Sequence, residues 1–211
     1  MIDVNEQIAS VARTVGVGEV DDGPVKAVTL ARTYATDIDD LWDAVTSAER
    51  IARWMTPVTG DLSLGGRYQL EGNAAGTITA CDPPRGFAAT WEFADAVSWI
   101  EVQLTPVDDD HTRLVLTHLA RPDEHWEQFG PGATGIGWDL ALLGLSLHLT
   151  TDADPPSDPM AWLGSPEGIS FMTASGQAWG DADIAGGEDP ATAGKAAERT
   201  FAAYTAPPDQ T

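Results

Sequence analysis

The sequence predicts an α+β fold in which an antiparallel β-sheet packs against one long helix. Two observations predict it. Residues 62–119 form short alternating polar and apolar segments separated by turn sequences, which is typical of an antiparallel meander with one buried face. Residues 136–149 then carry a wide apolar stripe at helical spacing, as a helix laid across a sheet requires.

The chain before the meander predicts a helix, a strand and two short helices. Apolar residues within 4–15 have helical spacing and Asp3 can cap them, so we expect an amphipathic helix that ends at Gly16. Residues 25–34 alternate like a strand. Two short helices are expected over about 37–46 and 47–54, because the apolar spacing returns to helical and Pro57 ends the second.

The meander itself divides into strands near residues 67–70, 76–81, 87–93, 98–106 and 112–119. Period-two alternation predicts which side chains face the core. On this basis Ile100, Val102 and Leu104 share the buried face with Leu114, Leu116 and His118, and Trp91 points the same way.

The C-terminal part of the chain predicts a polar linker over residues 121–134 and then the long helix over 137–149. Residues 152–159 contain three prolines and three aspartates, which break the chain. Further helices are expected within residues 160–184 and 190–204, the last one opened by Asp189 and Pro190.

Composition excludes several classes of function. The formal net charge of −22 opposes nucleic-acid binding, because a phosphate backbone would repel such a surface. A single cysteine, Cys81, cannot form an internal disulfide, and no histidine pair has metal-ligand spacing. With no signal peptide or spanning apolar run visible, the sequence predicts a cytoplasmic protein with no metal, no cofactor and no membrane insertion.

Several short motifs, in order, resemble one protein family. Trp42-Asp43-Ala44-Val45-Thr46 is followed by Glu49-Arg50-Ile51-Ala52-Arg53-Trp54, Gly65-Gly66-Arg67-Tyr68, Asp82-Pro83-Pro84-Arg85 and Thr90-Trp91-Glu92. Thr112-Arg113-Leu114, His118 and Gly137-Trp138 complete the pattern. In this order and spacing, residues 28–149 resemble the family related to the activator of heat-shock-protein-90 ATPase, within the START-like (SRPBCC) superfamily.

The resemblance implies the helix-grip fold, a curved antiparallel sheet wrapped around a long C-terminal helix. Two short helices would follow the first strand, with extra helices at both termini. It divides the chain into an N-terminal helical extension (residues 1–24), the helix-grip domain (25–152) and a C-terminal helical extension (153–211). The superfamily includes lipid carriers, hormone receptors and polyketide cyclases, so shared fold does not fix a function.

The helix-grip arrangement implies an interior pocket, and we expect six residues to lie near it: Trp54, Tyr68, Trp91, His118, Trp138 and Leu142. An apolar pocket with a few polar groups is the usual form of a small-molecule site. We therefore predict a carrier, sensor or sequestering protein for an apolar or lipid-like small molecule. The same aromatic side chains could instead fill the core.

Two alternative functions stay open at this stage. The first is a cyclase- or hydrolase-like enzyme, in which Tyr68, His118 or Arg32 would act as acid, base or oxyanion partner. The second is a protein-interaction or co-chaperone-like module. The terminal helices have apolar faces that must be buried on the core, over the pocket entrance or in a homodimer.

Overall fold

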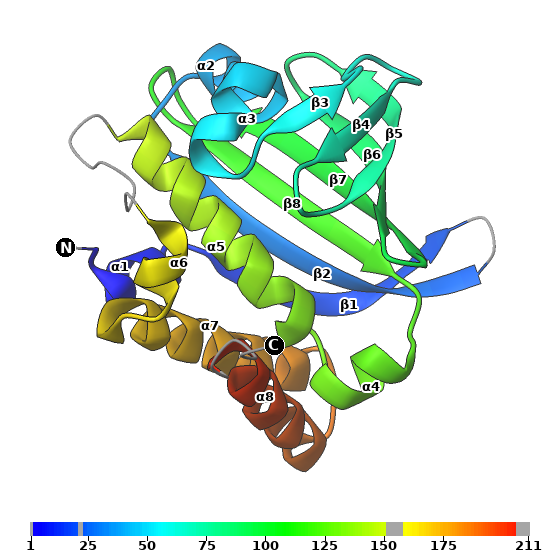
Figure 1. Ribbon diagram of the computed structural model, residues 1–211, viewed down its shortest axis with the longest axis vertical. Helices are drawn as coiled ribbons and strands as arrows, with labels where there is room; N and C mark the ends of the chain where they lie inside the picture. Colours follow the sequence, from blue (N-terminus) through cyan, green and yellow to red (C-terminus); the bar gives the residue numbers. More distant parts are fainter. Residues whose placement is uncertain (1, 21–22, 151–157, 206–211) are drawn as a thin grey trace.

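The protein is an α+β molecule with one curved sheet and a helix lying across it (Figure 1). The computed structural model describes residues 2–20, 23–150 and 158–205. The strands are β1 (Ala12–Val20), β2 (Gly23–Tyr34), β3 (Val58–Gly60), β4 (Arg67–Leu70), β5 (Ala75–Asp82), β6 (Gly86–Phe93), β7 (Ala96–Pro106) and β8 (Thr112–Ala120). The helices are α1 (Val4–Ala9), α2 (Ile38–Thr46), α3 (Ala48–Trp54), α4 (Glu124–Phe129), α5 (Gly132–Leu149), α6 (Pro159–Leu163), α7 (Pro166–Ala185) and α8 (Pro190–Thr205).

The eight strands form one antiparallel sheet in the order β1-β2-β8-β7-β6-β5-β4-β3. The predicted meander is confirmed from β4 to β8, where each strand pairs with the next one along the chain. The sheet is completed by the long-range pairing of β2 with β8, in which Leu30 lies opposite Leu116. This pairing brings the N-terminal strands beside the end of the meander.

The inner face of the sheet is the one that the alternation predicted. Val102 lies opposite Leu116, and Leu104 lies opposite Leu114, across the β7–β8 pair. All four side chains are buried. Because side chains alternate between the two faces of a strand, their sequence neighbours, including Glu101, lie on the opposite, solvent-facing side.

Helix α5 lies across this inner face and is buried on two sides. It begins at Gly132, before the predicted start, and carries apolar residues around most of its circumference, which is typical of a helix enclosed by its surroundings. One side faces the sheet interior, together with α2 and α3. The other side packs against α7, which lies next to α5 in Figure 1.

The N-terminal segment differs from the prediction. The expected helix over residues 4–15 ends at Ala9, and residues 12–20 form the edge strand β1. Helical spacing and strand alternation both fit the short apolar pattern there. Pairing decides in favour of the strand, because each residue of β1 from Ala12 to Val20 lies opposite a residue of β2.

The linker prediction is also wrong in part, because residues 124–129 form α4, capped by the Asp123 side chain. The predicted terminal helices are confirmed as α6, α7 and α8. The break predicted over residues 152–159 lies largely outside the described residues, as does the boundary at residue 152. The three-part division of the chain therefore stays a prediction.

The C-terminal helices pack on the parent fold through α7, which contacts α1, β1, α5 and α8. At the centre of this contact Arg13 of β1 donates two hydrogen bonds to the carboxylate of Asp139 in α5, of 3.0 and 2.9 Å. Ser175 and Trp179 of α7 also donate to Asp139. The side chains of Arg13 and Asp139 are only 6% and 1% exposed, so the network links three elements in the dry interior. The predicted homodimer stays a prediction.

No helix in the described part of the chain has both the length and the apolar character needed to cross a bilayer.

Candidate functional site

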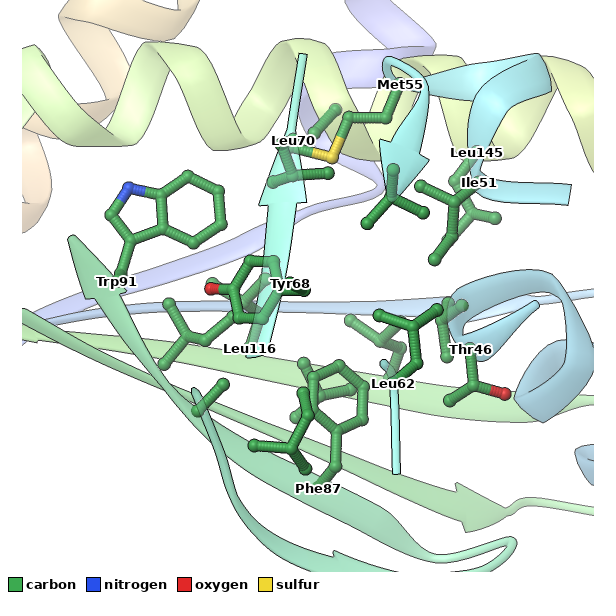
Figure 2. A pocket seen from close by; sticks show the side chains of 18 of the residues that line it. Thr46, Ile51, Met55, Leu62, Tyr68, Leu70, Phe87, Trp91, Leu116 and Leu145 are labelled. Atoms are coloured by element: carbon green, nitrogen blue, oxygen red, sulfur yellow. The ribbon is translucent and has the colours of Figure 1, made fainter. Parts of the chain in front are cut away.

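A cavity of about 140 Å³ lies between the inner face of the sheet and α5. Helices α2 and α3 and the short strands β3 and β4 form its other walls (Figure 2). In Figure 2 the ring of Trp91 and the side chain of Ile51 lie on opposite sides of the open space. An apolar cavity of about this size, roughly 150 Å³, accepts benzene in another protein. The space is therefore large enough for a small organic molecule.

The cavity wall is almost wholly apolar, and six of its side chains are aromatic. The aromatic side chains are Trp42, Trp54, Tyr68, Phe87, Trp91 and Trp138. The sheet contributes aliphatic residues from β7 and β8, among them Val102 and Leu116. Helix α5 contributes Ala141, Leu142 and Leu145 from the same side as Trp138, because residues three and four apart share one face of a helix.

Two glycines permit close approaches that shape this wall. A Cβ at Gly76 of β5 would lie 2.0 Å from the carbonyl oxygen of Thr90 and 2.8 Å from the hydroxyl of Tyr68. The Tyr68 ring can therefore cross β5 and reach β6. A Cβ at Gly144 of α5 would lie 2.2 Å from the carbonyl oxygen of Trp54, so this glycine lets the end of α3 sit directly against α5.

The polar side-chain atoms of the wall mostly have partners within the protein. Tyr68 donates to the carbonyl oxygen of Thr90 at 2.7 Å, and the indole nitrogen of Trp54 donates to that of Ala44 at 2.9 Å. Thr46 donates to the carbonyl oxygen of Trp42 within α2. Burial, and secondarily the charge of Glu92, raises the pKa of Tyr68 to about 12, so the phenol stays protonated at neutral pH.

His118 lies behind the cavity wall. Trp138 donates from its indole nitrogen to Nδ1 of His118 at 2.9 Å, and Nε2 of His118 is 2.9 Å from the hydroxyl of Ser98. Burial lowers the pKa of His118 to about 4, because desolvation disfavours the charged imidazolium. The imidazole is therefore neutral at physiological pH, and both of its nitrogens have partners.

The mouth of the cavity lies where its lining side chains are partly exposed. Trp42 of α2 and Phe87 of β6 meet there edge to face, with ring centroids 6.3 Å apart. Met55 and Leu62 of the wall are also half-buried, and Cys81 is exposed. The partly exposed portion of the cavity wall is thus largely apolar.

Five of the six predicted site residues line the cavity: Trp54, Tyr68, Trp91, Trp138 and Leu142. The sixth, His118, lies on the predicted inner face but contacts the cavity through Trp138 and Trp91. Arg32 lies elsewhere and donates to Gln7 of α1 and Ser146 of α5. Within the described part of the chain, Tyr68, His118 and Arg32 share no hydrogen-bond partner. Whether any of the six binds a ligand stays a prediction.

The predicted site residues did not include several lining residues, among them Trp42, Phe87, Met55 and Leu62. Trp42 reads as part of an apolar helix stripe, and Phe87 as the first residue of a strand. Met55 and Leu62 lie in or beside irregular segments, where no periodicity indicates a direction. A meeting of aromatic side chains from α2 and β6 carries no local signal, because the two elements are about 40 residues apart.

Comparison with known proteins gives the family. Residues 35–149, more than half of the 211-residue chain, match the family described as Activator of Hsp90 ATPase homolog 1-like protein. The chain belongs to this family. The match begins just after β2 and ends at the last residue of α5, so the activator-like segment contains every residue that lines the cavity.

Solved structures extend the likeness beyond that segment. The crystal structure of CalU16 from Micromonospora echinospora is 28% identical, with 82% of this chain and 97% of that chain covered and a TM-score of 0.67. Its solution NMR structure gives 28% identity, 83% and 96% coverage and a TM-score of 0.71. A conserved protein of unknown function from Enterococcus faecalis, 12% identical, shares the fold alone, with 88% and 96% coverage and a TM-score of 0.58. No curated protein sequence matches.

The activator-like segment offers no evident metal centre. Within residues 2–20, 23–150 and 158–205, no three histidine, cysteine, aspartate or glutamate side chains come together as metal ligands would. Among these residues, the charged side chains are absent from the cavity wall. What the arrangement can do is surround a small space with apolar side chains.

Proposed function

We propose that this protein binds a small apolar molecule in the cavity between α5 and the sheet. Its role would be to carry, sense or sequester that molecule. The family and the START-like fold support the proposal, since small-molecule binding is one of the functions found in the superfamily.

One observation carries the proposal: the wall presents a broad aromatic and aliphatic surface, and most of its polar side-chain atoms are already bonded to the protein. The hydroxyls of Tyr68 and Thr46 and the ring nitrogens of Trp54 and Trp138 all have acceptors. A ligand that needed many hydrogen bonds would leave most of its polar groups unpaired, which costs free energy. An apolar ligand incurs no such cost and gains from leaving water.

The same observation disfavours the enzyme alternative. Acid–base catalysis needs a titratable group that reaches the substrate and has a pKa near the working pH. Tyr68 has a pKa of about 12 and donates to the main chain. His118 has a pKa of about 4 and lies behind Trp138. Neither Tyr68 nor His118 therefore meets both requirements.

Thermal unfolding with naphthalene as a probe tests the proposal. Binding to the folded state raises the melting temperature by mass action, so we expect a concentration-dependent increase for the wild-type protein. Ala141→Leu should abolish the increase, because the larger side chain would occupy the cavity. Ala52→Leu is the matched control, since Ala52 is exposed on α3 and lies outside the cavity wall. An unchanged melting temperature with naphthalene, benzene and N-phenyl-1-naphthylamine, or equal responses of both variants, would refute the proposal.

Alkylation of Cys81 indicates where the probe sits. This thiol is the only cysteine of the chain, and it is exposed at the mouth. A probe that projects through the mouth should slow the reaction with a maleimide, and a probe enclosed behind Phe87 should not. Benzene and N-phenyl-1-naphthylamine, which differ in length, should therefore protect Cys81 to different extents.

A further inference from the structure

A chain of hydrogen bonds with one defined direction connects two tryptophans of the cavity wall, Trp91 of β6 and Trp138 of α5. An indole nitrogen can only donate, so Nδ1 of His118 must accept from Trp138 at 2.9 Å. The neutral imidazole therefore carries its proton on Nε2 and donates it to the hydroxyl of Ser98 at 2.9 Å. Ser98 in turn donates to the carbonyl oxygen of Trp91 at 3.0 Å.

The rings joined by this chain also pack together. The centroids of Trp91 and Trp138 are 4.9 Å apart, with their planes tilted by 55°. The ring of His118 meets both edge-on, at 6.1 Å from Trp91 and 5.9 Å from Trp138. His118 itself is held in the middle of the sheet, where it lies opposite Val28 of β2 and Ile100 of β7. The sheet therefore fixes the position of the imidazole. The indole rings of Trp91 and Trp138 both pack against the imidazole ring.

We propose that His118 is a positioning residue for the cavity: its Nδ1 holds the indole of Trp138 against Trp91 and so fixes the shape of the aromatic wall. The consequence for ligand affinity rests on the proposed function, whereas the orientation of the rings does not. Trp138 is 8% exposed. Without an acceptor, its buried nitrogen would lose its partner, and the ring would turn to find another acceptor or water.

The Trp91–Trp138 pair supplies a direct readout. Two indole rings this close and tilted couple their excited states, which produces a positive and a negative band side by side in far-ultraviolet circular dichroism. Among the described residues this is the one contact between two tryptophan rings. Trp138→Phe should remove the paired bands and thereby assign them.

Four variants then test the role of Nδ1. His118→Leu removes both bonds and should abolish the paired bands. His118→Asn places an amide oxygen near the position of Nδ1 and should retain them, whereas His118→Gln places its amide near Nε2 and should lose them. Ser98→Ala removes only the far end of the chain and should retain them. In naphthalene titrations, the variants that lose the bands should bind about tenfold more weakly, which is the effect of losing one ordinary hydrogen bond.

The outcomes separate this proposal from the function it builds on. Paired bands that persist in His118→Leu and His118→Gln would overturn the positioning role. Bands that are present in His118→Gln and absent in His118→Asn would overturn it as well. If His118→Leu does not fold, His118→Gln and His118→Asn answer the same question. If the bands follow the expected order while no probe binds to any variant, the positioning role stands and only the proposed function fails.

Discussion

The two sides of α5 differ in their residues and in how tightly they pack. Trp138, Ala141 and Leu145 face the cavity, where side chains leave about 140 Å³ unfilled. Gly135 and Asp139 face α7, where a Cβ at Gly135 would lie 2.2 Å from the Trp179 ring and the carboxylate of Asp139 accepts four hydrogen bonds from three side chains. One side of the helix is open and apolar, and the other is tightly packed and polar at its centre.

This difference explains how a helix can border an empty space without collapsing into it. Unfilled space costs dispersion contacts, and surrounding side chains tend to close it. The network at Asp139 holds α5 on the side that faces α7, through Arg13 of β1 and Trp179 of α7. The adjacent Trp138 is bonded to His118 of β8. The terminal elements thus support the cavity without lining it.

Removing the charge of Asp139 on the packed side of α5 should have the largest effect on the free energy of unfolding. Asp139→Asn leaves the guanidinium of Arg13 buried without its countercharge, and we expect the free energy of unfolding to fall by about 3–5 kcal/mol. Urea unfolding followed by tryptophan fluorescence measures it. The double replacement Arg13→Met with Asp139→Leu should recover much of the loss, since a buried ion pair can often be replaced by apolar side chains.

The control for this experiment is an exposed ion pair. Glu49 and Arg53 pair on the surface of α3, with side chains 78% and 57% exposed. Glu49→Gln should change the free energy of unfolding by less than about 1 kcal/mol. A loss of that small size in Asp139→Asn would mean that the buried network does not hold α5.

Acidification should lower the free energy of unfolding through His118, which lies on the cavity side of α5. Its pKa falls from 6.5, the ordinary value for histidine, to about 4 in the folded protein, so the unfolded chain binds more protons between these pH values. The stabilisation is present above pH 6.5 and is lost as the pH falls toward 4. Between about pH 7.5 and pH 5 the wild-type protein should lose about 2 kcal/mol from this group.

His118→Asn isolates this contribution, because it cannot be protonated and retains an acceptor for Trp138. The difference in unfolding free energy between wild type and His118→Asn, measured in urea at several pH values, should shrink by about 2 kcal/mol over that range. A difference that stays constant with pH would contradict the buried neutral imidazole.

Added volume should change the free energy of unfolding in opposite directions on the two sides of α5. Ala141→Leu adds carbon atoms into open space and should stabilise the protein by about 1 kcal/mol, as cavity filling commonly does. Gly135→Ala adds a single carbon on the packed side and should destabilise it by about 1–3 kcal/mol through overpacking. Thermal and urea unfolding of the two variants measure both signs, and a loss in both would mean that the cavity cannot accept added volume.

Some elements could be predicted because their local sequence patterns are compatible with only one type of secondary structure. The strands from Arg67 to Ala120 alternate cleanly between turns, and they form as expected. The pattern at residues 12–15 is compatible with two types of secondary structure, because Ala12, Thr14 and Val15 fit a short helix as well as a strand. The β-branched side chains favour the strand only weakly, and pairing with β2 decides it.

The candidate site divides in the same way. Alternation placed Trp91 and His118 on the inner face, and helical spacing placed Trp138 and Leu142 on α5 facing them. These two patterns could not show that the indole of Trp138 lies between His118 and the cavity and donates a hydrogen bond to the imidazole. Nor could they indicate that Asp139 is buried, since an aspartate within a helix is usually exposed.

The sequence by itself determined the strands of the meander, the long helix, the apolar inner face and the family, because each depends on the order and spacing of nearby residues. Only the tertiary structure decided that space remains between α5 and the sheet. That outcome depends on how far apart distant elements are held, by Gly135 against Trp179 and by Arg13 against Asp139. Such distances follow from side-chain volumes and contacts across the whole fold, and no local pattern encodes them.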